Sequence, residues 1–218
     1  MERTKNIIDQ LSEVAAVESV VVYGTDEAHL LIVTTDLEPA TLRALAPPVQ
    51  WWIEKTATWP RLLTQALIRD SIDVFPIEML ELSHRRRVLH GPDPFTNVRI
   101  EPEALRIQCE REVREKLMRL REAYIEHHAG RALRGMLAAS LATFSRIFRA
   151  CLVLLDVPAP ASDRDVIAAL CERLDLDPAP YFAVARGDDN AFEAYYRVLT
   201  ATEARIDRLV IKKSKENV

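Results

Sequence analysis

The chain has 218 residues, enough for one large domain or two small ones. Apolar residues make up 49% of it and charged residues 28%, the balance of an ordinary globular protein. The formal net charge of −4 excludes a global basic field, so the composition does not favour nucleic acid as a partner.

The three cysteines (Cys109, Cys151 and Cys171) are odd in number and never spaced as Cys-x-x-Cys. We therefore expect neither a disulfide framework nor a zinc knuckle, and we expect Cys109 and Cys151 to be buried apolar residues of helices. The start, MERTKNIIDQL, has no apolar signal core, and no run approaches the roughly 18–20 apolar residues that span a bilayer. These features predict a cytoplasmic protein with no membrane partner.

Helical and strand patterns mix in the first half of the chain. The expected elements are a helix over 4–16, strands over 19–23 and 30–34, a short helix over 37–45, a third strand over 49–55, a helical turn over 62–69 and a fourth strand over 72–82. Pro47 and Pro48 are expected to stop the short helix. Trp51 and Trp52 would then lie on opposite sheet faces, and Pro76 would make the fourth strand an edge or bulged strand.

The second half of the chain is helical throughout, after a predicted linker at residues 91–94 (Gly-Pro-Asp-Pro). Helices are expected over 101–128, over 132–157, from an N-cap at Ser162 to Asp177-Pro178, and over 190–212. The predicted fold class is α+β: a small mixed sheet with flanking helices over 1–98, then an all-α up-and-down four-helix bundle over 99–218.

Gly24 and Thr25 form a corner between the two predicted strands. A glycine lets backbone N–H groups approach phosphate oxygens closely, and a neighbouring hydroxyl adds a donor. The corner is therefore a candidate nucleotide-binding element, although a tight hairpin would have the same pattern.

The order of elements and several phrases carry a resemblance. The resemblance is carried by the segments VVVYGT, HLLIVTT and DVFPIEMLEL, and by RRRVLHGPDPF, which runs into a long charged helix. The chain resembles small bacterial members of the nucleotidyltransferase superfamily. In these proteins a minimal nucleotidyltransferase domain precedes a helical bundle of the HEPN or kanamycin-nucleotidyltransferase type. The resemblance covers nearly the whole chain, and it implies that substrates bind in the cleft between the two domains.

In that superfamily three carboxylates hold two metal ions, which clamp a nucleoside triphosphate and activate the acceptor hydroxyl. By resemblance, Gly24 and Thr25 stand for the Gly-Ser pair of the family. Glu27 and His29 occupy its two aspartate positions, and Asp73 is the candidate third acid.

The catalytic motif departs from the family pattern. The turn is short, Glu27 is one methylene longer than aspartate, and His29 offers nitrogen where Mg²⁺ prefers oxygen. Glu78 is a second candidate metal ligand beside Asp73. On a regular strand these two residues point to opposite faces, so only a bulge at Pro76 would bring them together.

Two basic features of the sequence each have a functional and a structural interpretation. Arg86, within the run at residues 84–87, is a candidate ligand for a nucleotide phosphate, whereas such a run also suits a solvated turn paired with local acids. Arg121 and His127, followed by His128, are separated by a five-residue gap that fits the Arg-x(4–6)-His motif of HEPN ribonucleases, although an Arg-rich helix also produces such a match by accident.

The leading hypothesis is a catalytically degenerate nucleotidyltransferase-like protein that acts as a nucleotide-binding or regulatory module. Its expected partners are a nucleoside triphosphate, with Mg²⁺ when a nucleotide is bound, and a protein partner or a second copy in a homodimer. One alternative is an active Mg²⁺-dependent nucleotidyltransferase that modifies a small molecule or a protein. The other is an antitoxin-like or RNA-directed HEPN-type module.

Overall fold

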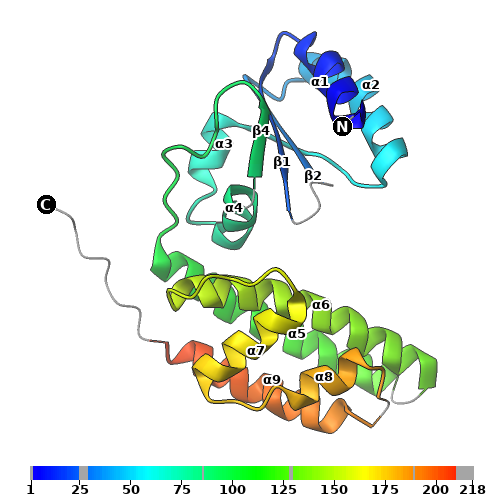
Figure 1. Cartoon of the computed structure of the whole chain (residues 1–218), viewed down its shortest axis with the longest axis vertical. Coiled ribbons are helices and arrows are strands. Elements are labelled where there is room, and N and C mark those ends of the chain that lie inside the picture. Colours follow the sequence, from blue (N-terminus) through cyan, green and yellow to red (C-terminus); the bar gives the residue numbers. More distant parts are fainter. Residues whose placement is uncertain (1, 25–28, 85, 128–129, 189, 210–218) are drawn as a thin grey trace, which may run out of the picture. The chain divides into compact units, whose positions relative to one another are not determined.

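The computed structural model describes residues 2–24, 29–84, 86–127, 130–188 and 190–209 (Figure 1). The chain divides into two compact units, Met1–Glu101 and Pro102–Val218. The first combines helices with a small mixed sheet, and the described part of the second is helical. The predicted α+β class is confirmed.

A four-stranded sheet in the order β3-β2-β1-β4 forms the centre of the first unit. Its strands are β1 (Val17–Tyr23), β2 (His29–Thr34), β3 (Arg61–Thr64) and β4 (Arg86–His90). β1 pairs antiparallel with β2 and with β4, whereas β3 runs parallel to β2. The two strands predicted from the β-branched runs are therefore the two central strands.

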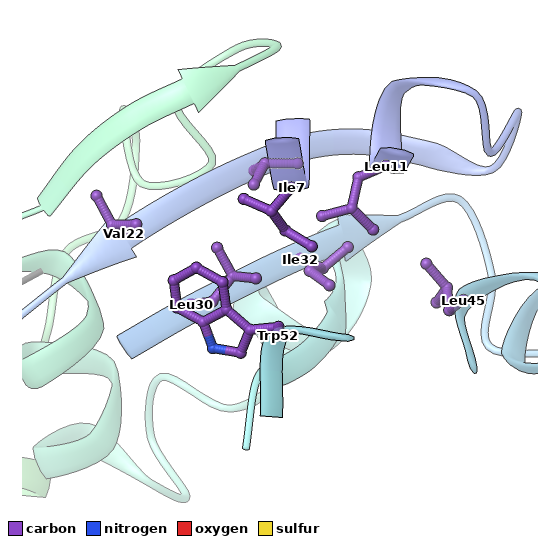
Figure 2. Packing of buried hydrophobic residues seen from close by; sticks show 8 residues of the cluster. Ile7, Leu11, Val22, Leu30, Ile32, Leu45 and Trp52 are labelled. Atoms are coloured by element: carbon purple, nitrogen blue, oxygen red, sulfur yellow. The ribbon is translucent and has the colours of Figure 1, made fainter. Parts of the chain in front are cut away.

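Both faces of this sheet are covered, which explains why β1 and β2 are continuous apolar runs rather than alternating ones. On one face Val20, Leu30 and Ile32 pack against two helices, α1 (Glu2–Ser12) and α2 (Pro39–Thr56). Figure 2 shows the residues that these helices contribute: Ile7, Leu11, Leu45 and Trp52. On the other face, Val21, Leu31 and Val33 pack against Ile68, Met79 and Leu82. These last three side chains belong to α3 (Gln65–Asp70) and α4 (Pro76–Ser83).

The predicted third strand over 49–55 is wrong, because these residues are the second half of α2. Pro47 and Pro48 lie inside this helix and do not stop it. The buried positions Thr41, Leu45, Pro48 and Trp52 follow helical spacing straight through the two prolines. Burial of this face outweighs the two lost backbone donors. Trp51 and Trp52 both pack toward the same core cluster, rather than on opposite faces of a sheet.

The predicted fourth strand over 72–82 is also wrong. Residues 71–75 form a turn and bend, and Pro76 begins α4 at its first helical position. Proline is favoured there because its missing N–H has no partner in the first turn and its φ is already helical. The fourth strand of the sheet is instead β4, which lies in the basic run. The helical turn predicted over 62–69 proves to be β3 followed by α3.

The segment predicted as a linker, residues 91–94, is packed onto the sheet. Gly91 has a φ of +72°, and a β-carbon there would lie 1.9 Å from the backbone oxygen of Glu18. The hydroxyl of Ser19 donates to the carbonyl oxygen of Pro92 at 2.7 Å, and Gln65 donates to that of Pro94 at 3.0 Å. The segment is therefore part of the first unit.

The second unit contains α5 (Pro102–Glu126), α6 (Gly130–Leu154), α7 (Asp163–Leu174), α8 (Ala179–Ala185) and α9 (Phe192–Asp207). The four predicted helices are α5, α6, α7 and α9; α8 is additional, and the last three residues predicted for the final helix lie outside the described part. α6 packs against α5, α7 and α8. Ser162 caps α7 by accepting the N–H of Asp165, as predicted.

An aromatic cluster fills the core of the second unit. Tyr181 lies edge-on to Phe148 and to Tyr195, at centroid distances of 5.7 and 5.5 Å. The Tyr181 hydroxyl is 2.8 Å from that of Thr202, and the Tyr195 hydroxyl is 3.0 Å from that of Ser140. Each buried phenol therefore has a hydrogen-bond partner, as burial requires.

Candidate functional site

The corner between β1 and β2 is the first candidate site. β1 ends at Tyr23, and Gly24 follows with a φ of +90°, a left-handed value suited to glycine. Thr25 and Glu27, the predicted donor and metal ligand, lie outside the described residues. β2 begins at His29, which pairs with Tyr23. The two rings stack at a centroid distance of 5.3 Å, so the strand ends carry an aromatic pair.

Arg61 is the residue at this site that the sequence analysis missed. It opens β3, and because β3 runs parallel to β2 with Arg61 opposite Leu31, it lies at the same sheet end as His29. Burial raises the pKa of Tyr23, while a hydrogen bond from the Arg61 guanidinium acts in the opposite direction. The sequence gives little indication of β3, because this strand has only four residues and α3 follows it at once.

Tyr23, His29 and Arg61 belong to one face of the sheet. Residues paired directly across strands share a face, and Tyr23 packs with the cluster that includes Leu31. This is the face covered by α3 and α4. The corner face, as we call these three residues, therefore joins an aromatic pair to a guanidinium. Such a group recognises the oxygens of a phosphate or carboxylate.

Asp73 and Glu78, the predicted metal ligands, do not lie on a strand. Asp73 is exposed in the turn before α4. Glu78 is in the first turn of α4, where the helix N-terminus favours a carboxylate, and it makes an interaction of its own. The expected bulged-strand geometry for this pair is therefore absent.

The described residues do not fit a magnesium site. Across the described ranges, no three His, Cys, Asp or Glu side chains cluster in a way that would hold a metal ion. β3, the strand hydrogen-bonded to β2, is Arg-Leu-Leu-Thr and brings a cation rather than a carboxylate to the corner. A guanidinium at this position repels a divalent cation.

Arg86, the predicted phosphate ligand, is engaged within its own unit. Its guanidinium donates to both oxygens of the Asp93 carboxylate, with Nε to Oδ1 at 2.9 Å and Nη2 to Oδ2 at 2.7 Å, and also to the carbonyl oxygen of Ser83. It also lies 5.5 Å from the ring centroid of Phe95. The contacts with Asp93 and Phe95 hold the 91–94 segment against β4, which gives Arg86 a structural role.

The other described basic side chains of residues 84–90 are divided between two elements. His84 is the exposed C-cap of α4, and Arg87 and His90 belong to β4. Arg87 makes an interaction of its own.

Of the predicted pair Arg121 and His127, only Arg121 lies within α5. The Arg121 guanidinium lies 5.6 Å from the ring centroid of Tyr196 and donates to its hydroxyl. His127 is exposed and follows the last residue of α5, while His128 lies outside the described residues. The contact with Tyr196 gives Arg121 a role in joining α5 to α9.

One helix in the described ranges, α6, is long and apolar enough to cross a bilayer by length and composition. Its best 18-residue window has a mean hydropathy of 1.5. Its buried side chains pack against α5, α7 and α8, so we assign this helix to the core of the second unit.

No family model matches the chain, and no curated protein matches it significantly. The nucleotidyltransferase resemblance therefore stays a prediction that depends on the motifs and on the order of elements.

Proposed function

We propose that this chain is a nucleotidyltransferase-like protein that has lost metal-dependent transfer and acts as a nucleotide-binding or regulatory module. The element order of the first unit supports the resemblance. A helix precedes two antiparallel strands joined at Gly24, and a further helix leads to a strand parallel to the second one.

The observation that carries the proposal is the position of Arg61. A two-metal transferase needs carboxylates around its triphosphate, because the ions must be held while charge develops on the transferred phosphoryl group. At this corner the neighbouring strand supplies a guanidinium that reaches Tyr23. A guanidinium binds phosphate oxygens without a metal, so the corner face suits binding of a nucleoside phosphate better than catalysis.

Thermal melting with ATP tests the proposal, first in EDTA and then with Mg²⁺. Binding to the folded state at ~100 times the dissociation constant adds about 2.7 kcal/mol of stability, which raises the melting temperature. We expect this rise in EDTA. Arg61→Gln removes it, whereas Arg69→Gln, a matched change of an exposed arginine on α3, retains it.

Two results would contradict the proposal. A rise that requires Mg²⁺, together with transfer of labelled nucleotide from ATP to an acceptor, would establish the active transferase instead. Equal melting temperatures with and without ATP, GTP, CTP and UTP would exclude nucleotide binding.

A further inference from the structure

The second unit contains a pair of buried cysteines that the proposed function does not use. Cys109 lies on α5 and Cys151 on α6, and both side chains are fully buried as free thiols. The two helices are the longest of the described part, at 25 residues each. The thiols therefore lie in the interface between the two main helices of this unit.

The two cysteines belong to the two helices of one hairpin. α5 ends at Glu126 and α6 begins at Gly130, so the short connection makes the two helices antiparallel neighbours. The Cys151 side chain is close enough to be the largest cause of the raised pKa of Cys109.

We propose that Cys109 and Cys151 are a redox-active dithiol, which a low-molecular-weight disulfide such as oxidised glutathione converts into a disulfide between α5 and α6. Two neighbouring buried thiols on packed helices need little movement to reach the bonding distance of their sulfurs. The bond would join the two longest helices without help from another chain.

The chemistry balances through thiol–disulfide exchange. One cysteine thiolate attacks a sulfur of oxidised glutathione, which forms a mixed disulfide and releases one glutathione thiolate. The second cysteine then attacks the protein sulfur of the mixed disulfide and releases the other glutathione. The protein loses two electrons and two protons, and one oxidised glutathione becomes two reduced glutathiones.

Access to the pair requires opening of the helix interface. The neighbouring Cys151 thiol and burial together raise the pKa of Cys109 well above its ordinary value, so the thiol stays protonated and shielded in the closed state. Burial also raises the pKa of the third cysteine, Cys171, to about 11. Cys171 lies on α7 and so serves as a matched internal control.

The test refolds the full chain from its reduced, denatured state in a buffer of reduced and oxidised glutathione, where all three thiols begin accessible. After acid quenching and alkylation, tryptic digestion maps the products. We expect a joined pair of peptides, residues 107–111 with 150–164, in the refolded monomer. The oxidised protein should unfold at a higher urea concentration than the reduced protein, and dithiothreitol should reverse the difference.

Variants separate this bond from general oxidation. Cys171→Ser should still give the joined peptides, while Cys109→Ser and Cys151→Ser should each abolish them, with circular dichroism confirming that the helices form. The proposal is overturned if the folded, wild-type protein retains both thiols in the most oxidising buffer. It is equally overturned if Cys171 replaces either cysteine in the recovered disulfide.

Discussion

A β-carbon on Gly91 would lie 1.9 Å from the backbone oxygen of Glu18, a separation that no real β-carbon contact shows. Gly91 follows β4 and Glu18 belongs to β1, so the absence of a side chain lets the chain turn close against the central strand. The atom that Gly91 approaches is backbone, which has no rotamer by which to move away.

Gly91→Ala should destabilise the first unit strongly. The left-handed φ of +72° and the backbone overlap act together, and we expect a loss of about 2–5 kcal/mol in the free energy of unfolding. Gly187→Ala is the control, because that glycine has a similar φ of +77° and no atom within 4 Å of its added β-carbon. There we expect a loss of about 1 kcal/mol. Urea unfolding followed by circular dichroism measures both; equal losses would contradict the packing argument.

The Arg86–Asp93 pair should give a measurable coupling energy. Its bidentate geometry and partial burial, with side chains 26% and 32% exposed, favour a coupling of about 1 kcal/mol. A double-mutant cycle with Arg86→Gln and Asp93→Asn measures it by urea unfolding. Additive losses would show that the pair contributes nothing beyond its separate side chains.

The same pair predicts a pH dependence. Hydrogen bonds from Arg86 lower the pKa of Asp93 in the folded chain. Its contribution to stability is therefore complete above the unfolded pKa of about 4 and is lost as the pH falls through the folded value. Asp93→Asn should flatten this part of the stability–pH curve; an unchanged acid limb would contradict the assignment.

Tyr181 and Tyr195 predict the behaviour of the second unit in alkali. Burial raises the pKa of both phenols above their ordinary value, while hydrogen bonds to Thr202 and Ser140 oppose that rise. Because the pKa of each phenol is higher in the folded than in the unfolded chain, its contribution to the free energy of unfolding is complete below the unfolded pKa of about 10. This contribution declines as the pH rises above that value. Phenolate absorbance from these residues should therefore appear only as the unit unfolds. Tyr181→Phe should make the decline with pH shallower; early ionisation of a folded unit would contradict the prediction.

Ser145→Ala should leave the stability of the second unit unchanged or raise it by up to about 1 kcal/mol. Ser145 is fully buried on α6, and its hydroxyl is the one buried side-chain polar atom of the described residues that has no hydrogen-bond partner. Ser140→Ala is the contrasting change, because it removes the partner of the Tyr195 hydroxyl and should be destabilising. Thermal melting measures both, and a large loss for Ser145→Ala would reveal a hydrogen bond to that hydroxyl.

The sequence correctly predicted those helices and strands that are marked by residues within the element itself. β1 and β2 are recognisable as β-branched runs, and α7 has its Ser162 cap in the sequence itself. Proline was ambiguous: Pro76 starts α4 and Pro47 sits within α2, although the same residue type also ends helices and interrupts strands. Tertiary burial decides among these roles, and no short window of sequence contains it.

The candidate site was less predictable than the fold. Arg61 reaches the corner only because β3 runs parallel beside β2, a pairing between residues thirty positions apart. Arg86 was predicted as a phosphate ligand from its basic neighbours, whereas its partner Asp93 depends on the close turn at Gly91. The role of Arg61 arises from a long-range strand pairing, and that of Arg86 from a turn whose close approach to Glu18 is not encoded by residue type and spacing.

The position of β1 between β2 and β4 has a consequence for how the chain is made. β1 pairs with β2 across a short connection, but Val20 pairs with His90, far downstream. As the chain leaves the ribosome, one hydrogen-bonding edge of β1 stays open until Arg86–His90 emerges, and an open edge recruits strands from other chains. The interval while α2, β3, α3 and α4 are being synthesised is therefore when nascent copies are most exposed to mispairing.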